Sequence, residues 1–244
     1  MIGMVLAAGA GRRLGDDTAD LPKTLLPVAG ERSILDIALH NLAAVGLEEV
    51  VVVTGFAAHR IDERVEDLQR KYGLRIETLF NPKAEEWNNA YSLWCARERF
   101  AEGVLMCNGD TVHPASVEEA VLAARGDDDL VIAVDDVKTL GEEEMKVHLS
   151  SAGHLDRIHK TLEPSTAAGE YIGVTLIEPA AAEPLTAALE ATWRRDPGLY
   201  YEDGYQEYVD RGQRVDICPI GEVSWVEVDD TADLERARLI ACHY

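Results

Sequence analysis

The chain has 244 residues, of which 47% are hydrophobic and 28% are charged. These values are typical of a folded domain with a full core, and they exclude a disordered or fibrous protein. The 45 acidic residues outnumber the 23 Lys and Arg, and the net charge of −22 argues against binding to nucleic acid or an anionic membrane. No apolar run approaches ~20 residues and the first residues lack a signal-peptide pattern, so we expect a cytoplasmic protein.

Lysine and cysteine usage is informative. Only six residues are lysine, so arginine is the ordinary surface cation and each lysine is a candidate for a specific role, with Lys71 taken as a surface residue. The four cysteines (Cys95, Cys107, Cys218 and Cys242) form no C-x-x-C pair. We therefore expect reduced thiols rather than a disulfide or a zinc site.

The first part of the chain alternates strands and helices. Residues 2–8 predict a buried strand that leads into a glycine-rich loop, and Ser33 caps a predicted helix that runs to about residue 45. Further strands are expected at 49–55, 75–80, 103–107 and 129–134, and helices at about 58–72, 88–99 and 115–124. This order predicts an α/β protein with a doubly wound, Rossmann-like mixed sheet.

The pattern becomes less regular and richer in strands after residue 135. We expect a hairpin at 146–159, strands at 171–177, 214–217 and 224–228, and helices from about 179, 203 and 231. No linker rich in Gly, Pro or Ser divides the chain, so a single domain over residues 1–244 is expected.

The loop after the first strand carries the first motif. Its glycines, Gly9 and Gly11, allow backbone N–H groups to approach phosphate oxygens, and Arg13 can add a bidentate guanidinium. The third glycine of G-x-G-x-x-G and the G-K-[ST] of a Walker A loop are both absent, so a simple turn is the alternative. Lys23 follows on a proline-stiffened stretch, Leu21 to Gly30.

These two segments, LAAGAGRRLG and LPKTLLPVAG, resemble the opening of the nucleotidyltransferase superfamily that makes NDP-sugars and CDP-alcohols. The resemblance implies that Arg13 and Lys23 bind the triphosphate; Arg12 stands where Ser or Thr is common. Downstream, Asn108-Gly109-Asp110 and WVEVDD at 225–230 resemble the superfamily's metal-binding segments and imply Asp110 and Asp229 as Mg²⁺ ligands. The alternative for such aspartates is a turn or a helix cap, and Asp230 is expected to cap the last helix.

The segment Trp87 to Leu93 resembles the branch that includes choline-phosphate cytidylyltransferases. This likeness implies that Asn88, Asn89 and Ser92 recognise the cytosine edge, with helix capping as the alternative. It also implies that Lys146 and Lys160 lie near the acceptor's phosphate and that Glu170 and Tyr171 lie near its head group. Tyr200, Tyr201 and Glu202 predict an aromatic and acidic wall for an ammonium group, with core packing as the alternative.

We therefore expect a nucleotidyltransferase that moves CMP from CTP to a small phospho-alcohol, aminoalkyl phosphate or phosphonate and releases pyrophosphate. Its nucleotide-binding part would be residues 1–135, and residues 136–244 would bind the acceptor and supply the last helix. A sugar-1-phosphate nucleotidyltransferase is the first alternative. A dinucleotide-dependent oxidoreductase is the second, but this sequence lacks the acidic residue that such an enzyme would carry after the strand at residues 49–55. A homodimer stays open.

The expected site residues fall into four groups. The catalytic residues are Arg13, Lys23, Lys146 and Lys160, and the metal ligands are Asp110 and Asp229. The nucleotide is assigned to Ala7, Ala8, Gly9, Gly11, Arg12, Arg13, Lys23, Asn88, Asn89, Ser92 and Asn108. The acceptor is assigned to Asp110, Lys146, Glu170, Tyr171, Tyr200, Tyr201 and Glu202.

Overall fold

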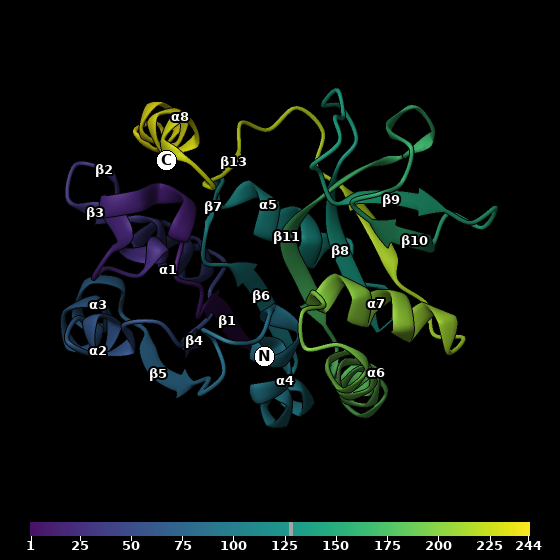
Figure 1. The fold of residues 1–244 in the computed structure, drawn as a ribbon, viewed down its shortest axis with the longest axis horizontal. Coiled ribbons are helices and arrows are strands. Elements are labelled where there is room, and N and C mark those ends of the chain that lie inside the picture. Colours follow the sequence, from purple (N-terminus) through teal and green to yellow (C-terminus); the bar gives the residue numbers. More distant parts are fainter. Residues whose placement is uncertain (127–128) are drawn as a thin grey trace.

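The computed structural model describes residues 1–126 and 129–244. Over these residues a central sheet of nine strands runs through the molecule, in the order β10-β9-β11-β6-β1-β4-β5, with β8 beside β11 and β12 beside β8 (Figure 1). Its parallel part consists of β1 (Ile2–Ala7), β4 (Glu49–Thr54), β5 (Arg75–Phe80) and β6 (Val104–Asn108). The mixed, doubly wound α/β sheet predicted from the sequence is confirmed.

The second half of the chain extends this sheet instead of starting another. Strand β11 (Gly169–Ile177) pairs antiparallel with β6 and with β8 (Leu130–Asp135), and β12 (Asp216–Pro219) runs parallel to β8. The predicted hairpin forms β9 (Lys146–Leu149) and β10 (Leu155–His159), which attaches to the start of β11.

Helices cover both faces of the sheet because the buried strands are apolar on both sides. One core packs the sheet against α1 (Ile34–Ala44), α3 (Val65–Tyr72) and α5 (Ser116–Ala123). The other packs it against α4 (Asn89–Cys95), α6 (Ala182–Arg195) and α7 (Tyr201–Asp210). Within the described residues no helix has the length and apolar character needed to cross a membrane.

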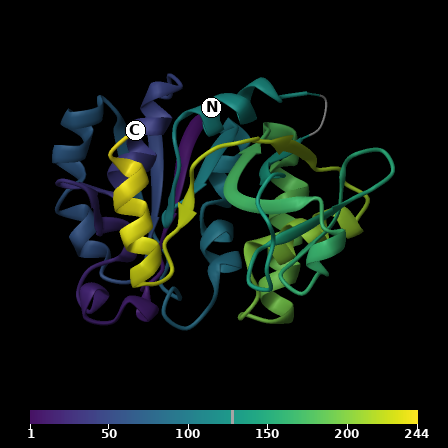
Figure 2. The ribbon, with the colours of Figure 1, turned by 90° about the horizontal axis from the view of Figure 1, so that it is seen from above.

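Two small sheets and the last helix complete the fold. Strands β2 (Pro27–Ala29) and β3 (Arg32–Ser33) form a hairpin, and β7 (Thr111–Val112) pairs with β13 (Val226–Glu227). A third core joins them to α8 (Thr231–Ala241), so the last helix returns to lie against the N-terminal half of the chain (Figure 2).

Two predicted helices are broken. The helix expected at 58–72 is split into α2 (Ala58–Asp62) and α3, and the one expected at 88–99 ends at Cys95 and continues as a 3₁₀ turn over Arg97–Glu102. The tyrosine-rich helix begins earlier than expected, at Tyr201, because the Asp203 side chain accepts a hydrogen bond from the Tyr200 backbone and caps it.

Lys71 lies at the surface, as predicted, but it also has a structural partner. Its ammonium donates to Asp36 at 2.7 Å, and Asp36 is fully buried in α1, where it also completes the capping box with Ser33. Burial alone would raise the pKa of Asp36, but hydrogen bonds from Lys71, Ser33 and Tyr72 hold it well below its usual range. Lys71 therefore ties α3 to α1.

Candidate active site

The glycine-rich loop and Lys23 lie together beyond the carboxyl end of β1, the edge where open α/β sheets bind ligands. Gly11 has a φ of +60°, and a Cβ there would lie 2.8 Å from Cβ of Lys23. Only glycine combines this left-handed conformation with so close an approach. The loop is thus shaped to seat Lys23, which opens a 3₁₀ turn directly after Pro22.

Two aspartates far apart in sequence are brought together by the β7–β13 pair. In its register Thr111 faces Glu227, and the Val228 backbone donates to the Asp110 carbonyl at 2.9 Å. Asp110 precedes β7 and Asp229 follows β13, so both carboxyls project at the same edge. Asp230 accepts from the Asp233 backbone at 2.9 Å and caps α8, as predicted.

Lys23 lies between these two carboxylates. Its Nζ atom is 2.7 Å from Asp110 and 3.2 Å from Asp229, and the Arg13 guanidinium is 2.8 Å from Asp229. Burial acts to lower the pKa of Lys23, but the charges of Asp110 and Asp229 raise it above its usual value. The same two cations hold the pKa of Asp229 below its usual value, against the effect of burial. Lys23, Arg13, Asp110 and Asp229 therefore form one charged cluster.

Glu227 is a third acid that the sequence reasoning missed. Its carboxyl lies within 4.8 Å of the carboxyl oxygens of Asp110 and Asp229, and burial together with these two negative neighbours raises its pKa to about 8. The alternation Glu227, Val228, Asp229 carried the signal, because residues i and i+2 of a strand share one face. Three convergent carboxylates offer the all-oxygen donor set that a hard divalent cation such as Mg²⁺ prefers.

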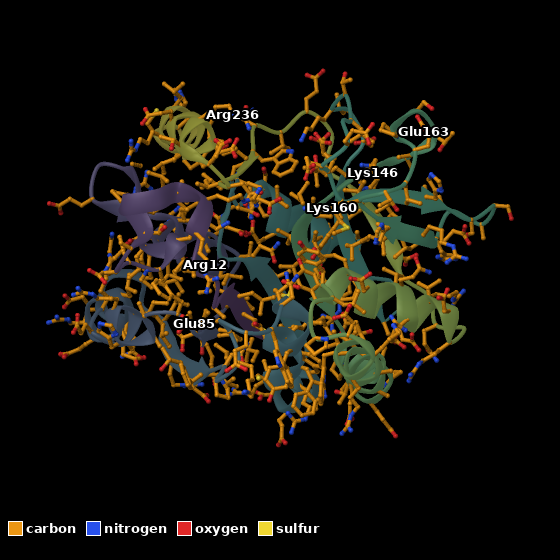
Figure 3. The ribbon with its side chains drawn as sticks, in the orientation of Figure 1. Arg12, Glu85, Lys146, Lys160, Glu163 and Arg236 are labelled. Carbon is orange, nitrogen blue, oxygen red and sulfur yellow. The ribbon has the colours of Figure 1, made fainter. Side chains whose placement is uncertain are left out.

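A cavity of about 240 Å³ extends from this cluster along the carboxyl edge of the sheet. It is lined by the predicted nucleotide residues Ala8, Gly9, Gly11, Arg13, Lys23, Asn88, Asn89, Ser92 and Asn108. Of the two other predicted nucleotide residues, Ala7 is buried and Arg12 is exposed. In Figure 3 Arg12 lies on the opposite side of the central region from Lys160. Figure 3 places both lysines named for the acceptor, Lys146 and Lys160, on the side of the β9–β10 hairpin.

The polar residues at the start of α4 also have structural partners. Asn88 caps the helix and donates to the Gly198 carbonyl, and Asn89 accepts from the Tyr201 backbone. The Ser92 hydroxyl accepts from buried Asn81 at 2.8 Å. The predicted capping alternative therefore holds for Asn88, and all three side chains still border the cavity.

The far end of this cavity gathers most of the predicted acceptor residues. Lys160 borders it and lies 5.6 Å from the ring centre of Tyr200, which is partly exposed. Glu202 is buried, its Oε2 atom has no hydrogen-bond partner among the described residues, and burial raises its pKa to about 8. Tyr171 and Asp110 line the same cavity.

Two predicted acceptor residues are placed elsewhere. Lys146 is fully buried, and its ammonium donates to the carbonyls of Gly141, Glu142 and Glu144 at 2.8–3.1 Å. It closes the turn before β9 and has no free face for a phosphate. Tyr201 is also fully buried, and its hydroxyl donates to Asn108 at 2.8 Å, so it supports a cavity residue rather than forming an aromatic wall.

A larger cavity of about 570 Å³ adjoins the first and shares Arg13, Lys160, Glu227 and Asp229 with it. Here the predicted acceptor residue Glu170 binds Lys138 at 2.6 Å, and Lys138 lies 5.1 Å from the ring centre of Trp225. Lys138 is a second residue that the sequence reasoning missed, although the scarcity of lysine had marked it.

Comparison with known proteins supports the superfamily that the sequence resembles. The profile of the MobA-like NTP transferase domain matches residues 3–199. The chain belongs to this family. The predicted nucleotidyltransferase superfamily is thereby confirmed, and with it an enzyme domain of this class.

Individual relatives point to the same class. The chain is 33% identical over 244 aligned residues to CMP-5'-(3-aminopropyl)phosphonate synthase of Streptomyces rubellomurinus, covering 96% of this chain and 38% of that protein. It is 30% identical over 106 residues to choline-phosphate cytidylyltransferase of Streptococcus pneumoniae, covering 43% of each. The chain thus spans less than half of either relative in these matches. The structure of the inositol-1-phosphate CTP transferase from T. maritima has the same fold, with a TM-score of 0.79, 23% identity, and coverage of 96% of this chain and 94% of that one.

Proposed function

We propose that this protein is a Mg²⁺-dependent cytidylyltransferase that joins CMP from CTP to a small phosphate or phosphonate and releases pyrophosphate. The cluster of Arg13, Lys23, Asp110 and Asp229 beside the glycine loop carries this proposal. The two cations can bind the β- and γ-phosphates, and the acids can hold a metal ion against the α-phosphate.

The reaction is an in-line displacement that needs positioning and charge stabilisation rather than a covalent enzyme intermediate. An oxygen of the acceptor's phosphate attacks the α-phosphorus, and the bond to the bridging oxygen of the leaving pyrophosphate breaks. Lys23 exchanges a carboxylate partner for a phosphate as the nucleotide enters, and Arg13 and Lys23 then stabilise the charge that develops on pyrophosphate. Mg²⁺ held by Asp110, Asp229 and Glu227 would supply further charge stabilisation at the α-phosphate.

Preference for CTP is supported by the start of α4. Asn88, Asn89 and Ser92 offer donors and acceptors that can pair with the edge of a cytosine, and they border the same cavity as Lys23. Two relatives are named for reactions with CMP or choline phosphate, which agrees with this preference.

A cationic acceptor is supported by the far end of the cavity. Glu202 is a buried acid there, and Tyr200 offers an aromatic face near the surface. An ammonium group can bind such carboxyls and aromatic faces, and Lys160 is left to bind the acceptor's phosphate. The aminopropyl and choline groups in the names of the two relatives are also cationic.

The proposal is tested by measuring pyrophosphate release for CTP, UTP, GTP and ATP against a panel of acceptors, each with Mg²⁺ and with EDTA. The panel contains choline phosphate, 3-aminopropylphosphonate, inositol 1-phosphate and glucose 1-phosphate. We expect the highest kcat/KM with CTP, an amine-bearing acceptor and Mg²⁺. A preference for glucose 1-phosphate would identify a sugar nucleotidyltransferase, and no release with any pair would exclude the proposed reaction.

A further inference from the structure

A second group of metal-binding side chains lies inside the protein, on the face of the sheet that α1 and α5 cover. It consists of Cys107 in β6, His113 just after β7 and Glu118 in α5. One donor atom from each lies within 4.8 Å of the others, and all three residues are at most 1% exposed. Asn41 from α1 packs against them and is also fully buried.

The Glu118 carboxylate in this group has only long contacts. Asn41 Nδ2 is 3.3 and 3.4 Å from its two oxygens, Nδ1 of His113 is 3.5 Å away, and Sγ of Cys107 is 3.4 Å away. Charge-assisted hydrogen bonds to a carboxylate are normally about 2.7–2.9 Å long. A fully buried carboxylate is costly without a close partner, and here every one of these partners lies 3.3 Å or more away. Oδ1 of Asn41, in the same group, is likewise buried with no hydrogen-bond partner in the described chain.

These separations match the edges of a zinc coordination shell. Zinc lies about 2.3 Å from sulfur and about 2.0–2.1 Å from nitrogen and oxygen, so a tetrahedral shell places S and O about 3.5 Å apart, and N and O about 3.3 Å apart. The observed S–O and N–O distances are 3.4 and 3.5 Å. The two contacts use different oxygens of Glu118, Oε1 toward Cys107 and Oε2 toward His113, so both oxygens face the centre of the group.

We propose that Cys107, His113 and Glu118 bind a zinc ion. A thiolate, an imidazole and a carboxylate are the ligand types that zinc takes in proteins. The Asn41 amide donates to Glu118 and to the His113 carbonyl, and thereby orients two of the ligands. The site lies apart from Asp110, Glu227 and Asp229, and it contradicts the expectation that no cysteine binds zinc.

The charges of this site balance. A thiolate and a carboxylate neutralise Zn²⁺, so the bound site is neutral, which suits a dry interior. Zinc binding releases the proton of the Cys107 thiol.

Two of the ligands flank the turn that carries Asp110. Cys107 is the next-to-last residue of β6 and His113 follows β7 directly, so the zinc ion would hold both ends of the segment Asn108–Val112. The proposed zinc site therefore fixes the position of Asp110 from behind the sheet without contacting a substrate.

The experiment uses the full chain without a histidine tag, unfolded and refolded with one equivalent of ZnCl₂ or CoCl₂, or with a chelator. Excess MgCl₂ is present throughout to occupy the acidic cluster. We expect about one zinc per chain by elemental analysis, a thiolate-to-cobalt absorption band in the cobalt form, and a lower thermal midpoint in the chelator sample. Cys107→Ala and Glu118→Gln should each reduce bound zinc at least 10-fold. Cys218→Ala, which removes another buried cysteine, is the matched control and should retain the zinc.

If the substituted proteins do not fold, a second variant still tests the proposal. This variant keeps Cys107 as its sole cysteine and is made by replacing Cys95, Cys218 and Cys242. This chain should retain the cobalt band. If wild-type protein binds less than ~0.1 zinc per chain, shows no such band and has the same thermal midpoint with chelator, the group is a hydrogen-bond network and the proposal is wrong. This outcome is independent of pyrophosphate release, so it leaves the proposed transferase unaffected.

Discussion

The ammonium group of Lys23 is closely surrounded by acidic side chains in the cavity. Its side chain is 13% exposed and contacts two carboxylates, Asp110 and Asp229, which the proposed function assigns to the metal ion beside the triphosphate. The absence of a side chain at Gly11 lets the loop approach the Lys23 Cβ closely. The contribution of Lys23 to catalysis should therefore fall on the nucleotide and not on the acceptor.

Lys23→Ala is expected to lower kcat/KM for CTP at least about 100-fold while the acceptor KM changes less than about 3-fold. Lys23→Arg should restore little, because a planar guanidinium cannot replace a compact ammonium between two carboxylates. The measurement is steady-state pyrophosphate release with each substrate varied. Lys83→Ala is the control, since Lys83 pairs with exposed Glu86, and Lys71 is unsuitable because it contacts Asp36. Equal losses in both alanine variants would contradict the assignment.

The protonation of Glu202 can be followed through the pH dependence of the free energy of unfolding, which is measured without catalysis. Its folded pKa is about 8 because it is buried, against an unfolded value of about 4.5. Folding therefore takes up a proton between about pH 4.5 and 8, and the stability that the protonated form provides is lost as pH rises through this window.

Relative to Glu202→Gln, the free energy of unfolding of the wild type should decrease with a slope of at most about 1.4 kcal/mol per pH unit. Urea unfolding of both proteins at pH 5, 6, 7 and 8 measures this difference. Parallel stability curves for the two proteins would show that Glu202 keeps an ordinary pKa.

At the scale of secondary-structure elements, sequence pattern predicted the order of strands and helices because buried parallel strands are apolar and helix starts carry capping residues such as Ser33 and Asp230. It could not place Lys146, because nothing local shows that three carbonyls of the preceding turn would take its ammonium. It also missed the contact of Tyr201 with Asn108, which joins residues 93 positions apart. Contacts of this kind depend on which elements pack together, and the hydrophobic periodicity of the sequence does not carry that information.

The loop after β1 offers a direct test of local geometry. Gly11→Ala should lower the free energy of unfolding by roughly 1–2 kcal/mol, because an L-residue is strained at φ +60° and its Cβ would press on Lys23. Gly9→Ala is the matched control: no atom lies within 4 Å of its added Cβ, and its φ is not positive. We expect a change of no more than a few tenths of a kcal/mol there. Urea denaturation of both variants gives the comparison, and similar losses would contradict the strained-loop interpretation.

The molecule as a whole carries a net charge of −22, and three of its acids, Asp110, Glu227 and Asp229, face one another where the metal is proposed to bind. Ordinary salt screens surface repulsion in general, whereas a bound divalent cation stabilises only the folded chain that assembles its ligands. Comparing MgCl₂ with NaCl at equal ionic strength separates specific magnesium binding from general screening.

MgCl₂ should raise the thermal midpoint of the wild type by about 2 °C or more above NaCl of equal ionic strength. Asp110→Asn and Asp229→Asn should each lose this extra rise, and pyrophosphate release should decrease at least about 100-fold. Differential scanning fluorimetry measures the midpoints, and Asp156→Asn, an exposed change on β10, is the control. An identical magnesium effect in all four proteins would place the ion elsewhere.

The short β7–β13 pair has a consequence for protein synthesis. It joins Val112 to Val226, so more than one hundred residues must be translated between the two halves of the proposed metal site. At about 5–20 residues per second, a ribosome needs roughly 6–23 s to cover that interval. Throughout that time the nascent chain carries Asp110 without Asp229. With the proposed function, a growing polypeptide would expose the glycine loop well before it could hold a metal-bound triphosphate, and turnover would begin only after residue 229 has left the ribosome and docked.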